Sequence, residues 1–468
     1  MSSSVSSNRS LWADLRASIR GVPYDFTEGS LGRAILLLSV PMVLEMFMQA
    51  VFEVADIFFV GRLGADAVAA VGLAASLVIL VFAVGIGLSM AAAAMVARRI
   101  GERDPEGAAA AAVQALAVSL VFSLPVAALG IGYAPELLRL MGATEHVVAA
   151  GTGYTAVLLG TNTTILFLFL INAIFRGAGD AALAMRALWL ANVLNIVLDP
   201  LFIFGWGPFP ELGVTGAAVA TAVGRGIGVG YQCHALLRGR SRIRIRRHHL
   251  RPDPGVIRRL LRVSGTGILQ YLIGTASWLG VIRIIATFGS AAVAGYTIAV
   301  RVIIFALLPS WGLGNAAATL VGQNLGAKKP ERAARAVWIT AFVNTAFLGL
   351  VALAIQFVAT PLVMLFTTDP AVIPYGTACL RIVSYSYVFW AFGMVVVQAF
   401  NGAGDTDTPT WINLVCFWLI QIPLAYLLAR PLEMGPNGVF AAIAIAQAIL
   451  AVLGVLAFRQ GRWKRKVI

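Results

Sequence analysis

Long apolar stretches, divided by short polar segments, follow one another along the 468-residue chain from residue 34 onward. They reach the roughly 20 residues that an α-helix needs to cross the hydrocarbon core of a bilayer. Hydrophobic residues make up 59% of the chain and charged residues 12%, against about 25% charged in soluble domains. We therefore expect an all-α integral membrane protein. The twelve predicted membrane-spanning helices are 34–58, 67–96, 108–132, 149–174, 183–206, 213–237, 259–285, 291–321, 335–358, 377–400, 408–429 and 437–459.

The chain contains an internal duplication. Arg-Gly-Ala-Gly-Asp at Arg176–Asp180 recurs 225 residues later as Asn-Gly-Ala-Gly-Asp at Asn401–Asp405. The pairs at the same offset include Gly87 with Gly312, Gly101 with Gly326 and Pro105 with Pro330. In membrane proteins, two equivalent halves are the usual build of a secondary transporter. We expect two six-helix bundles related by this duplication.

The duplication and the charge pattern together divide the chain into five parts. The predicted parts are a cytoplasmic tail 1–33 with a short interfacial helix near 11–20, an N-lobe 34–237, a basic cytoplasmic linker 238–258, a C-lobe 259–459 and a cytoplasmic tail 460–468. The first 33 residues lack the early apolar core of a cleaved signal peptide.

The net charge of +14 is distributed as membrane topology requires. Ten arginines and one acid, Asp253, lie in 238–262, and the other basic clusters fall in loops on the same predicted side. By the positive-inside rule, both termini and the linker are cytoplasmic in a plasma-membrane protein. We expect membrane lipids, rather than nucleic acid, to be the partners of this charge, with the linker resting on anionic headgroups.

Four carboxylates fall inside predicted spans: Glu45, Glu53, Asp56 and Asp199. A charge at the bilayer centre costs about 2.5–3.5 kcal/mol on insertion scales, so each is a candidate functional group. Structural roles are the alternatives. Glu53 and Asp56 lie near the outer end of their helix, where water reaches, Asp199 precedes Pro200 as a helix cap would, and Glu45 could pair with a base on the cytoplasmic side.

Helical spacing places these acids beside amides. Gln49 shares one side of the first span with Glu45 and Asp56. In the fifth span, Asn192, Asn195 and Asp199 form one stripe. Two polar stripes on apolar helices should face each other across an interior cavity, and their oxygen-rich groups suit either a proton or a hard monovalent cation.

The second half lacks this chemistry. At the repeat offsets, Glu45 corresponds to Gln270, Asp56 to Val281, and Asp199 to Ile422. No predicted span of the C-lobe holds an acid. The titratable groups are therefore confined to the N-lobe. The three cysteines and four histidines show no spacing typical of a metal site or a disulfide, and no cofactor is expected.

At this point the chain resembles the multidrug and toxic compound extrusion (MATE) family over about residues 30–460. The motifs that carry the resemblance are Pro41, 54–61 (VADIFFVG), 195–200 (NIVLDP), 213–221 (GVTGAAVAT), 312–326 (GLGNAAATLVGQNLG) and 402–406 (GAGDT). The resemblance implies a V-shaped pair of six-helix bundles that exports organic cations by alternating access. It is strongest to the DinF-like and archaeal members.

In those members the coupling site lies in the N-lobe. The resemblance assigns cation or proton coupling to Asp56, Asn195 and Asp199, with Na⁺ as one candidate ion. It adds a helix 6 threonine, for which Thr221 is the best match and Thr215 the alternative.

The same resemblance implies a substrate chamber and a hinge. Gln49, Tyr154 and Asn172 match positions that line the drug chamber, and Pro41 allows the first span to bend. Glu45 is grouped with the chamber residues, although the family pattern gives it no role of its own.

The sequence thus predicts a Na⁺- or H⁺-coupled antiporter, not an enzyme, that exports amphipathic, mostly cationic compounds and acts as a monomer. One alternative is a flippase for a lipid-linked precursor. It predicts a cationic cavity, whereas the interior charges here are expected to be mostly acidic, with Arg301 the chief exception. A passive channel or a membrane scaffold is the other alternative.

Overall fold

Helices form nearly all of the regular structure in the computed structural model, which describes residues 11–468, and no strand occurs in that range. Residues 1–10 of the predicted N-terminal tail lie outside the described part. Among the described residues, nine helices are long and apolar enough to cross a membrane, and two bent helix pairs each make one further span. The helix Val214–Arg238, which contains Arg225 and several glycines, completes the twelve predicted spans.

The short helix predicted near 11–20 is present as α1 (Leu11–Arg20) and precedes the N-lobe. The helices of the N-lobe are α2 (Leu31–Val60), α3 (Ala65–Gly101), α4 (Pro105–Gly132), α5 (Ala134–Leu140), α6 (Glu145–Gly160), α7 (Asn162–Ala178), α8 (Ala181–Phe204) and α9 (Val214–Arg238).

The C-lobe repeats this order after the linker. Its helices are α10 (Pro254–Ala286), α11 (Ser290–Gly326), α12 (Pro330–Met364), α13 (Ile373–Ser384), α14 (Tyr387–Gly402), α15 (Asp407–Asn413), α16 (Ile422–Ala429) and α17 (Pro436–Arg459), with a π-helical stretch at Leu414–Gln421 between α15 and α16.

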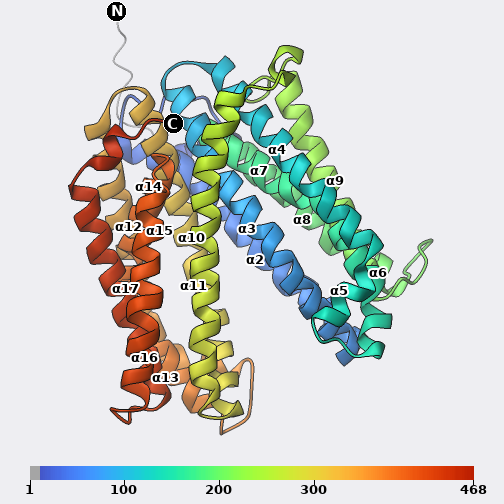
Figure 1. Cartoon of the computed structure of the whole chain (residues 1–468). Coiled ribbons are helices and arrows are strands. Elements are labelled where there is room, and N and C mark those ends of the chain that lie inside the picture. Colours follow the sequence, from blue (N-terminus) through green and yellow to red (C-terminus); the bar gives the residue numbers. More distant parts are fainter. Residues whose placement is uncertain (1–10) are drawn as a thin grey trace, which may run out of the picture.

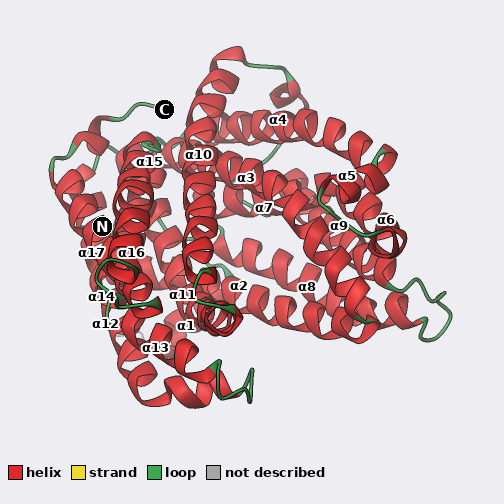
Figure 2. Ribbon diagram, turned by 60° about the horizontal axis from the view of Figure 1, so that its bottom comes forward, coloured by secondary structure: helices red, strands yellow, loops and turns green. Residues whose placement is uncertain are grey.

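The two bundles meet at one end of the molecule and diverge toward the other (Figure 1). The linker and the segment after α17 lie at the end where the bundles meet, which we call the closed end. Seen along the bundles, the helices of each lobe group on their own side, with α2, α3, α10 and α11 between them (Figure 2). This arrangement matches the expected pair of six-helix bundles.

Both lobes contain a broken span at the same position of the repeat. The predicted span 149–174 bends by 44° between α6 and α7, at Thr161, and 377–400 bends by 60° between α13 and α14, near Ser386. At each break a side-chain hydroxyl donates a hydrogen bond to a backbone carbonyl of the preceding turn. Thr161 Oγ1 donates to Val157 O (2.7 Å), and Ser386 Oγ donates to Val383 O (2.7 Å). Such side chains compete with the helix ladder, so the continuous spans that we predicted are interrupted there.

The inter-lobe seam pairs α2 with α11 and α3 with α10. Glycines allow the close approach. A Cβ on Gly87 of α3 would lie 2.6 Å from the carbonyl oxygen of Ser264, and one on Gly312 of α11 would lie 2.8 Å from the backbone nitrogen of Val43. These glycines are equivalent positions of the two halves, so the seam follows the symmetry of the duplication.

At the closed end, α3 and α11 cross with their backbones in contact. A Cβ on Gly101 would overlap the carbonyl oxygen of Gln323, and a Cβ on Gly326 would overlap that of Arg98. Gln323 also reaches across the seam, where its Nε2 donates to Gly177 O of α7 (2.9 Å). The two lobes are therefore held together here by backbone packing that leaves no room for side chains.

The duplicated Gly-Ala-Gly-Asp turns hold different segments. Gly179 adopts a φ of 87° and Gly404 a φ of 78°, which reverses the chain at the closed end. Asp180 then accepts hydrogen bonds from Ser241 Oγ (2.6 Å) and from the linker backbone, whereas Asp405 lies 3.1 Å from Lys466 Nζ. One copy of the turn thus anchors the linker and the other anchors the segment after α17.

The linker is shorter than predicted. We placed it at 238–258, but α10 begins at Pro254. The Asp253 carboxylate accepts from Gly255 N (2.8 Å) and Val256 N (3.1 Å), which caps the new helix one residue before the proline that starts it. The arginines at 258 and 259 are therefore part of the first turns of α10.

Candidate coupling site in the N-lobe

The polar stripes of α2 and α8 face each other, as their spacing predicted. Asn192 Nδ2 of α8 donates to Gln49 Oε1 of α2 (3.3 Å), and Gln49 Nε2 donates to Glu53 Oε1 (3.2 Å). Glu53 is exposed, in keeping with its place near the outer end of the helix. Pro41 is buried three turns before Glu53 in the interior of α2, beside the position where Gly312 packs against Met42 and Val43.

The centre of the site is formed by Asn195 and Asp199 of α8 with Thr221 of α9. With the Asn195 amide oriented so that both of its polar atoms are satisfied, its nitrogen donates to Asp199 Oδ2 (3.0 Å) and its oxygen accepts from Thr221 Oγ1 (2.8 Å). Gly224 makes this possible, because a Cβ there would lie only 2.7 Å from Ala191 O. Of the two threonines considered, Thr221 bonds to Asn195, and Thr215 packs against Gly153.

Asp199 is a buried carboxylate that can accept further hydrogen bonds. Its residue has no exposed surface, and its Oδ1 has no hydrogen-bond partner among the described residues. A carboxylate oxygen without a partner in a membrane interior is costly, so such an oxygen is suited to take up a proton or to ligate a cation.

Asp56 and Tyr154 lie near this centre without bonding to it. Asp56 is half-buried on α2 and interacts electrostatically with Asp199. Tyr154 of α6 is buried and is within electrostatic reach of both carboxylates. Asn195, Asp199, Thr221, Asp56 and Tyr154 thus come from four helices to one region of the N-lobe.

Arg225 is the site residue that sequence reasoning missed. It lies one helical turn after Thr221 on α9, is half-buried, and is within electrostatic reach of Asp56 and Tyr154. The surrounding sequence, Gly-Arg-Gly-Ile-Gly, is typical of close helix packing. Gly224 and Gly228 do pack against α8. The sequence could have indicated Arg225, because it is a lone arginine inside a predicted span and follows a candidate ligand by four residues.

Glu45 and Asn172 belong to a second polar cluster, nearer the closed end. Asn172 Nδ2 donates to Glu45 Oε1 (3.1 Å) and its Oδ1 accepts from Gln232 Nε2 (2.7 Å). Arg176 Nη1 pairs with the same Glu45 oxygen at 2.7 Å. Of the two roles considered for Glu45, the structure shows pairing with a base. It places Asn172 in this cluster rather than beside Asp56.

A cavity of about 150 Å³ separates this cluster from the C-lobe. Arg176 lines it on the N-lobe side, and a chain of amides lines it on the other. In that chain Gln398 Nε2 donates to Asn315 Oδ1 (3.1 Å) and Asn401 Nδ2 donates to Gln398 Oε1 (2.9 Å). Most of the other lining residues are apolar, so the amides and Arg176 form the polar part of this cavity between the lobes.

Two arginines, Arg176 and Arg225, lie among the interior charges, which we expected to be mostly acidic. Arg301, which we expected to be the chief exception, is exposed on α11. Arg176 and Arg225 each lie close to a carboxylate, which hydropathy along the chain cannot reveal.

Two histidines of the linker meet one acid at the start of α4. His248 Nε2 lies 2.8 Å and His249 Nε2 2.9 Å from Glu106 Oε2. His249 Nδ1 accepts the backbone N–H of Arg246 (3.0 Å), so in the neutral ring the proton resides on Nε2 and is donated to Glu106. A metal-bound histidine donates from its second nitrogen instead. The cluster is therefore a clamp between the linker and α4.

Comparisons with known proteins agree with this architecture. The MatE family model matches residues 41–201 and 264–427, more than half of the chain. The probable multidrug resistance protein YoeA of Bacillus subtilis is 26% identical over 444 residues, covering 94% of this chain and 96% of that protein. The probable multidrug resistance protein NorM of Thermotoga maritima is 26% identical over 440 residues, covering 93% and 94%.

A solved structure has the same fold over almost the whole length. The structure described as the outward-facing conformation of a multidrug resistance MATE family transporter of the MOP superfamily superimposes with a TM-score of 0.88 at 29% identity, covering 94% of this chain and 98% of that one. With the family model matched in both lobes, the chain belongs to the MatE family, the multidrug and toxic compound extrusion transporters.

Proposed function

We propose that this chain is a cation-coupled antiporter that exports amphipathic, mostly cationic organic compounds across the plasma membrane, with Na⁺ or H⁺ as the coupling ion. Relatives named as multidrug resistance proteins, matched over almost their whole length, support drug export. The N-lobe position of the acids supports the DinF-like type of coupling. The chain acts as a monomer, with both termini and the linker in the cytoplasm.

The observation that carries the proposal is the buried, partly unsatisfied carboxylate of Asp199. It accepts a hydrogen bond from Asn195, which Thr221 orients, and it faces the charge of Asp56. A proton or Na⁺ arriving at Asp199 or Asp56 neutralises part of this charge. A bound organic cation then loses its electrostatic attraction and leaves.

The shape of the molecule fits one state of an alternating-access cycle. The bundles meet at the end that carries the basic loops, so under the positive-inside rule they diverge toward the outside. The likeness to an outward-facing transporter supports this orientation. Neutralising Asp56 on α2 allows this helix to bend at Pro41 and to narrow the chamber. Inward movement of one cation supplies about 2.3 kcal/mol per 100 mV of membrane potential.

Efflux of ethidium from cells, and uptake into everted vesicles under separate Na⁺ and pH gradients, test the proposal. Asp56→Asn and Asp199→Asn should each abolish gradient-driven transport, because Asn cannot exchange a charge. Asp66→Asn is the matched control, since Asp66 is exposed at the start of α3. Full activity in both Asp56→Asn and Asp199→Asn would rule out this coupling site.

A flippase for a lipid-linked precursor remains the second candidate because Arg176 and Arg225 lie in the interior. Such an activity needs cationic groups for a phosphate. It predicts that Arg176→Gln and Arg225→Gln stop transport, and that ethidium efflux is absent from the wild type.

A further inference from the structure

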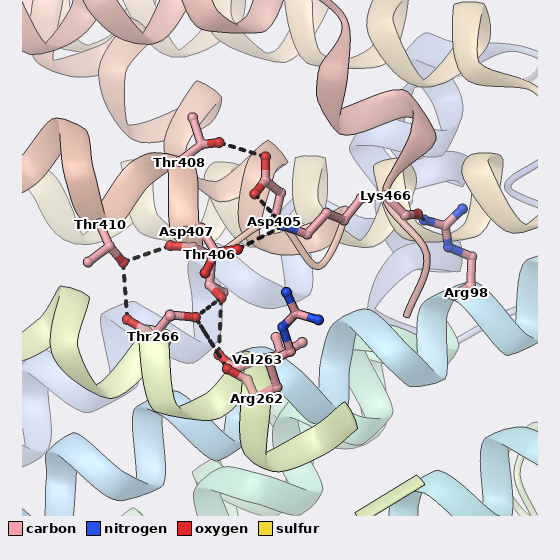
Figure 3. Close-up of polar contacts among 10 residues, drawn as sticks. All are labelled: Arg98, Arg262, Val263, Thr266, Asp405, Thr406, Asp407, Thr408, Thr410 and Lys466. Carbon is pink, nitrogen blue, oxygen red and sulfur yellow. Dashed lines mark hydrogen bonds and ion pairs between the residues drawn. The ribbon is translucent and has the colours of Figure 1, made fainter. Parts of the chain in front are cut away.

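A second charged cavity lies at the closed end, outside the transport path. It has a volume of about 360 Å³. Three parts of the chain enclose it: the first turns of α10, the turn between α14 and α15, and the segment after α17 (Figure 3). The basic side chains that line it are Arg259, Arg262, Arg465 and Lys466.

The walls of this cavity are fixed by hydrogen bonds. Thr266 of α10 shares a hydrogen bond with Thr406, and Thr406 Oγ1 donates to Val263 O (3.1 Å). Thr410 Oγ1 donates to Thr266 O (3.1 Å), which ties α15 to α10 (Figure 3).

The segment after α17 is anchored at several points. Trp463 is fully buried and stacks on Phe458 with ring centroids 4.6 Å apart. Arg98 Nη2 of the N-lobe donates to Lys466 O (2.8 Å), so this wall also links the two lobes. Ile468 is buried against Gly404. The cavity is therefore enclosed by fixed elements.

The basic side chains of the cavity differ in whether a carboxylate lies beside them. Lys466 Nζ lies 3.1 Å from Asp405 and 2.8 Å from Asp407. Burial disfavours its charge, but the hydrogen bonds of these carboxylates outweigh burial and raise the pKa of Lys466. Among residues 11–468, no carboxylate lies within 4.0 Å of Arg259, Arg262 or Arg465. Three exposed guanidinium groups thus line one cavity, and its lining carboxylate, Asp407, is paired with Lys466.

Apolar side chains continue from the cavity toward the membrane. Val263 lines its floor. Leu269 follows on the α10 stripe of Arg262 and Thr266, and is 50% exposed. Trp411, next to Thr410 on α15, is 66% exposed, and exposed tryptophans are typical of the membrane interface. A ligand with a charged head and an apolar tail matches this sequence of surfaces.

We propose that this cavity binds the phosphate of an anionic phospholipid from the cytoplasmic leaflet, with its acyl chains lying along α10 and α15. Three arginines with planar guanidinium groups are suited to phosphate oxygens. A bound lipid joins α10, the Asp405 turn and the segment after α17 at the point where Arg98 reaches across the seam. The lipid thereby stabilises the closed end. This site is independent of the coupling proposed above.

Native mass spectrometry of the full chain in a neutral detergent, titrated with dioleoylphosphatidylglycerol, tests the proposal. Arg262→Gln and Arg465→Gln should each weaken lipid binding by about fivefold, the contribution of one basic residue near an anionic lipid. Arg258→Gln, an exposed arginine of α10 outside the cavity, is the matched control and should bind as the wild type does.

Two further arms identify the ligand. Dioleoylphosphatidylcholine, which has a phosphate but no net charge, should bind equally weakly to wild type and variants. Millimolar inorganic phosphate should not displace phosphatidylglycerol, because it lacks the acyl chains. Displacement by inorganic phosphate would overturn the lipid assignment. Equal phosphatidylglycerol binding by wild type, Arg262→Gln and Arg465→Gln would overturn the site itself.

Discussion

Arg176 and Glu45 form an ion pair in the interior of the N-lobe, with Nη1 2.7 Å from Oε1 and with 15% and 2% of their side chains exposed. The pair lies between α2 and α7, beside the cavity that separates the lobes. It is distinct from the coupling centre at Asp199. The pair holds α2 against α7 at the closed end of the chamber.

Removing one partner of this pair should destabilise the protein more than removing both. Glu45→Gln leaves the Arg176 charge uncompensated and should cost up to about 3–5 kcal/mol, because a buried charge loses its partner. Arg176→Gln should act similarly on Glu45. The double variant should recover most of the loss. Thermal unfolding in detergent provides the double-mutant cycle, and strictly additive losses would contradict a direct pair.

Pro41→Ala should keep the fold and slow transport. Alanine restores the backbone donor that proline lacks and favours a straight α2 by up to about 3 kcal/mol, which reduces a bent population about a hundredfold. Efflux of ethidium should fall while expression and thermal stability are kept or rise. Pro125→Ala is the control, because Pro125 interrupts α4 on an exposed face. Equal efflux by both variants would argue against a hinge at Pro41.

Arg225→Gln should tighten the binding of organic cations. The guanidinium lies within electrostatic reach of Asp56 and reduces its attraction for a cationic substrate. Loss of that charge should lower the Kd of ethidium about tenfold. This change corresponds to a small part of the electrostatic interaction energy between partly buried charges. Fluorescence titration measures the Kd, with Arg238→Gln at the exposed end of α9 as control. Weaker ethidium binding would mean that Arg225 contributes to substrate binding directly.

Gly101→Ala should destabilise the protein, and Gly72→Ala should not. On Gly101 the added methyl group would overlap the carbonyl oxygen of Gln323, whereas nothing lies within 4 Å of the Cβ position of Gly72 on the same helix. Overpacking costs about 1–3 kcal/mol, and alanine in an open helical position gains about 1 kcal/mol over glycine. Thermal unfolding compares the two variants. Gly326→Ala should behave like Gly101→Ala.

Hydropathy and self-comparison were sufficient to predict much of this fold. Apolar length fixes the number of spans, and the offset between the halves fixes the two bundles. The facing of Gln49 and Asn192 followed from helical periodicity, because each helix has a single polar stripe that must avoid lipid. The family resemblance singled out Thr221 as a candidate ligand, and the structure shows its hydrogen bond to Asn195.

The features that escaped prediction depend on contacts between distant segments. Arg225 is polar in an otherwise small-residue helix, and only the packing of α9 on α8 brings it toward Asp56. Window averages also pass over the breaks at Thr161 and Ser386, since the apolar residues continue on both sides of each break. The partner of Glu45 lies more than a hundred residues away in the chain, so no local pattern could select Arg176.

The crossing of α3 and α11 bears on the ancestry of the chain. Gly101 meets the Gln323 carbonyl and Gly326 meets the Arg98 carbonyl, and the two glycines are the same position of the repeat. In a dimer of single copies, this glycine of each subunit would have contacted the equivalent carbonyl of the other subunit across a two-fold axis. Duplication joined the subunits but left the two contacts dependent on each other. A side chain acquired by one copy must be accommodated by the other. The halves can therefore differ in sequence at Asp56 while both keep glycine at the α3–α11 crossing.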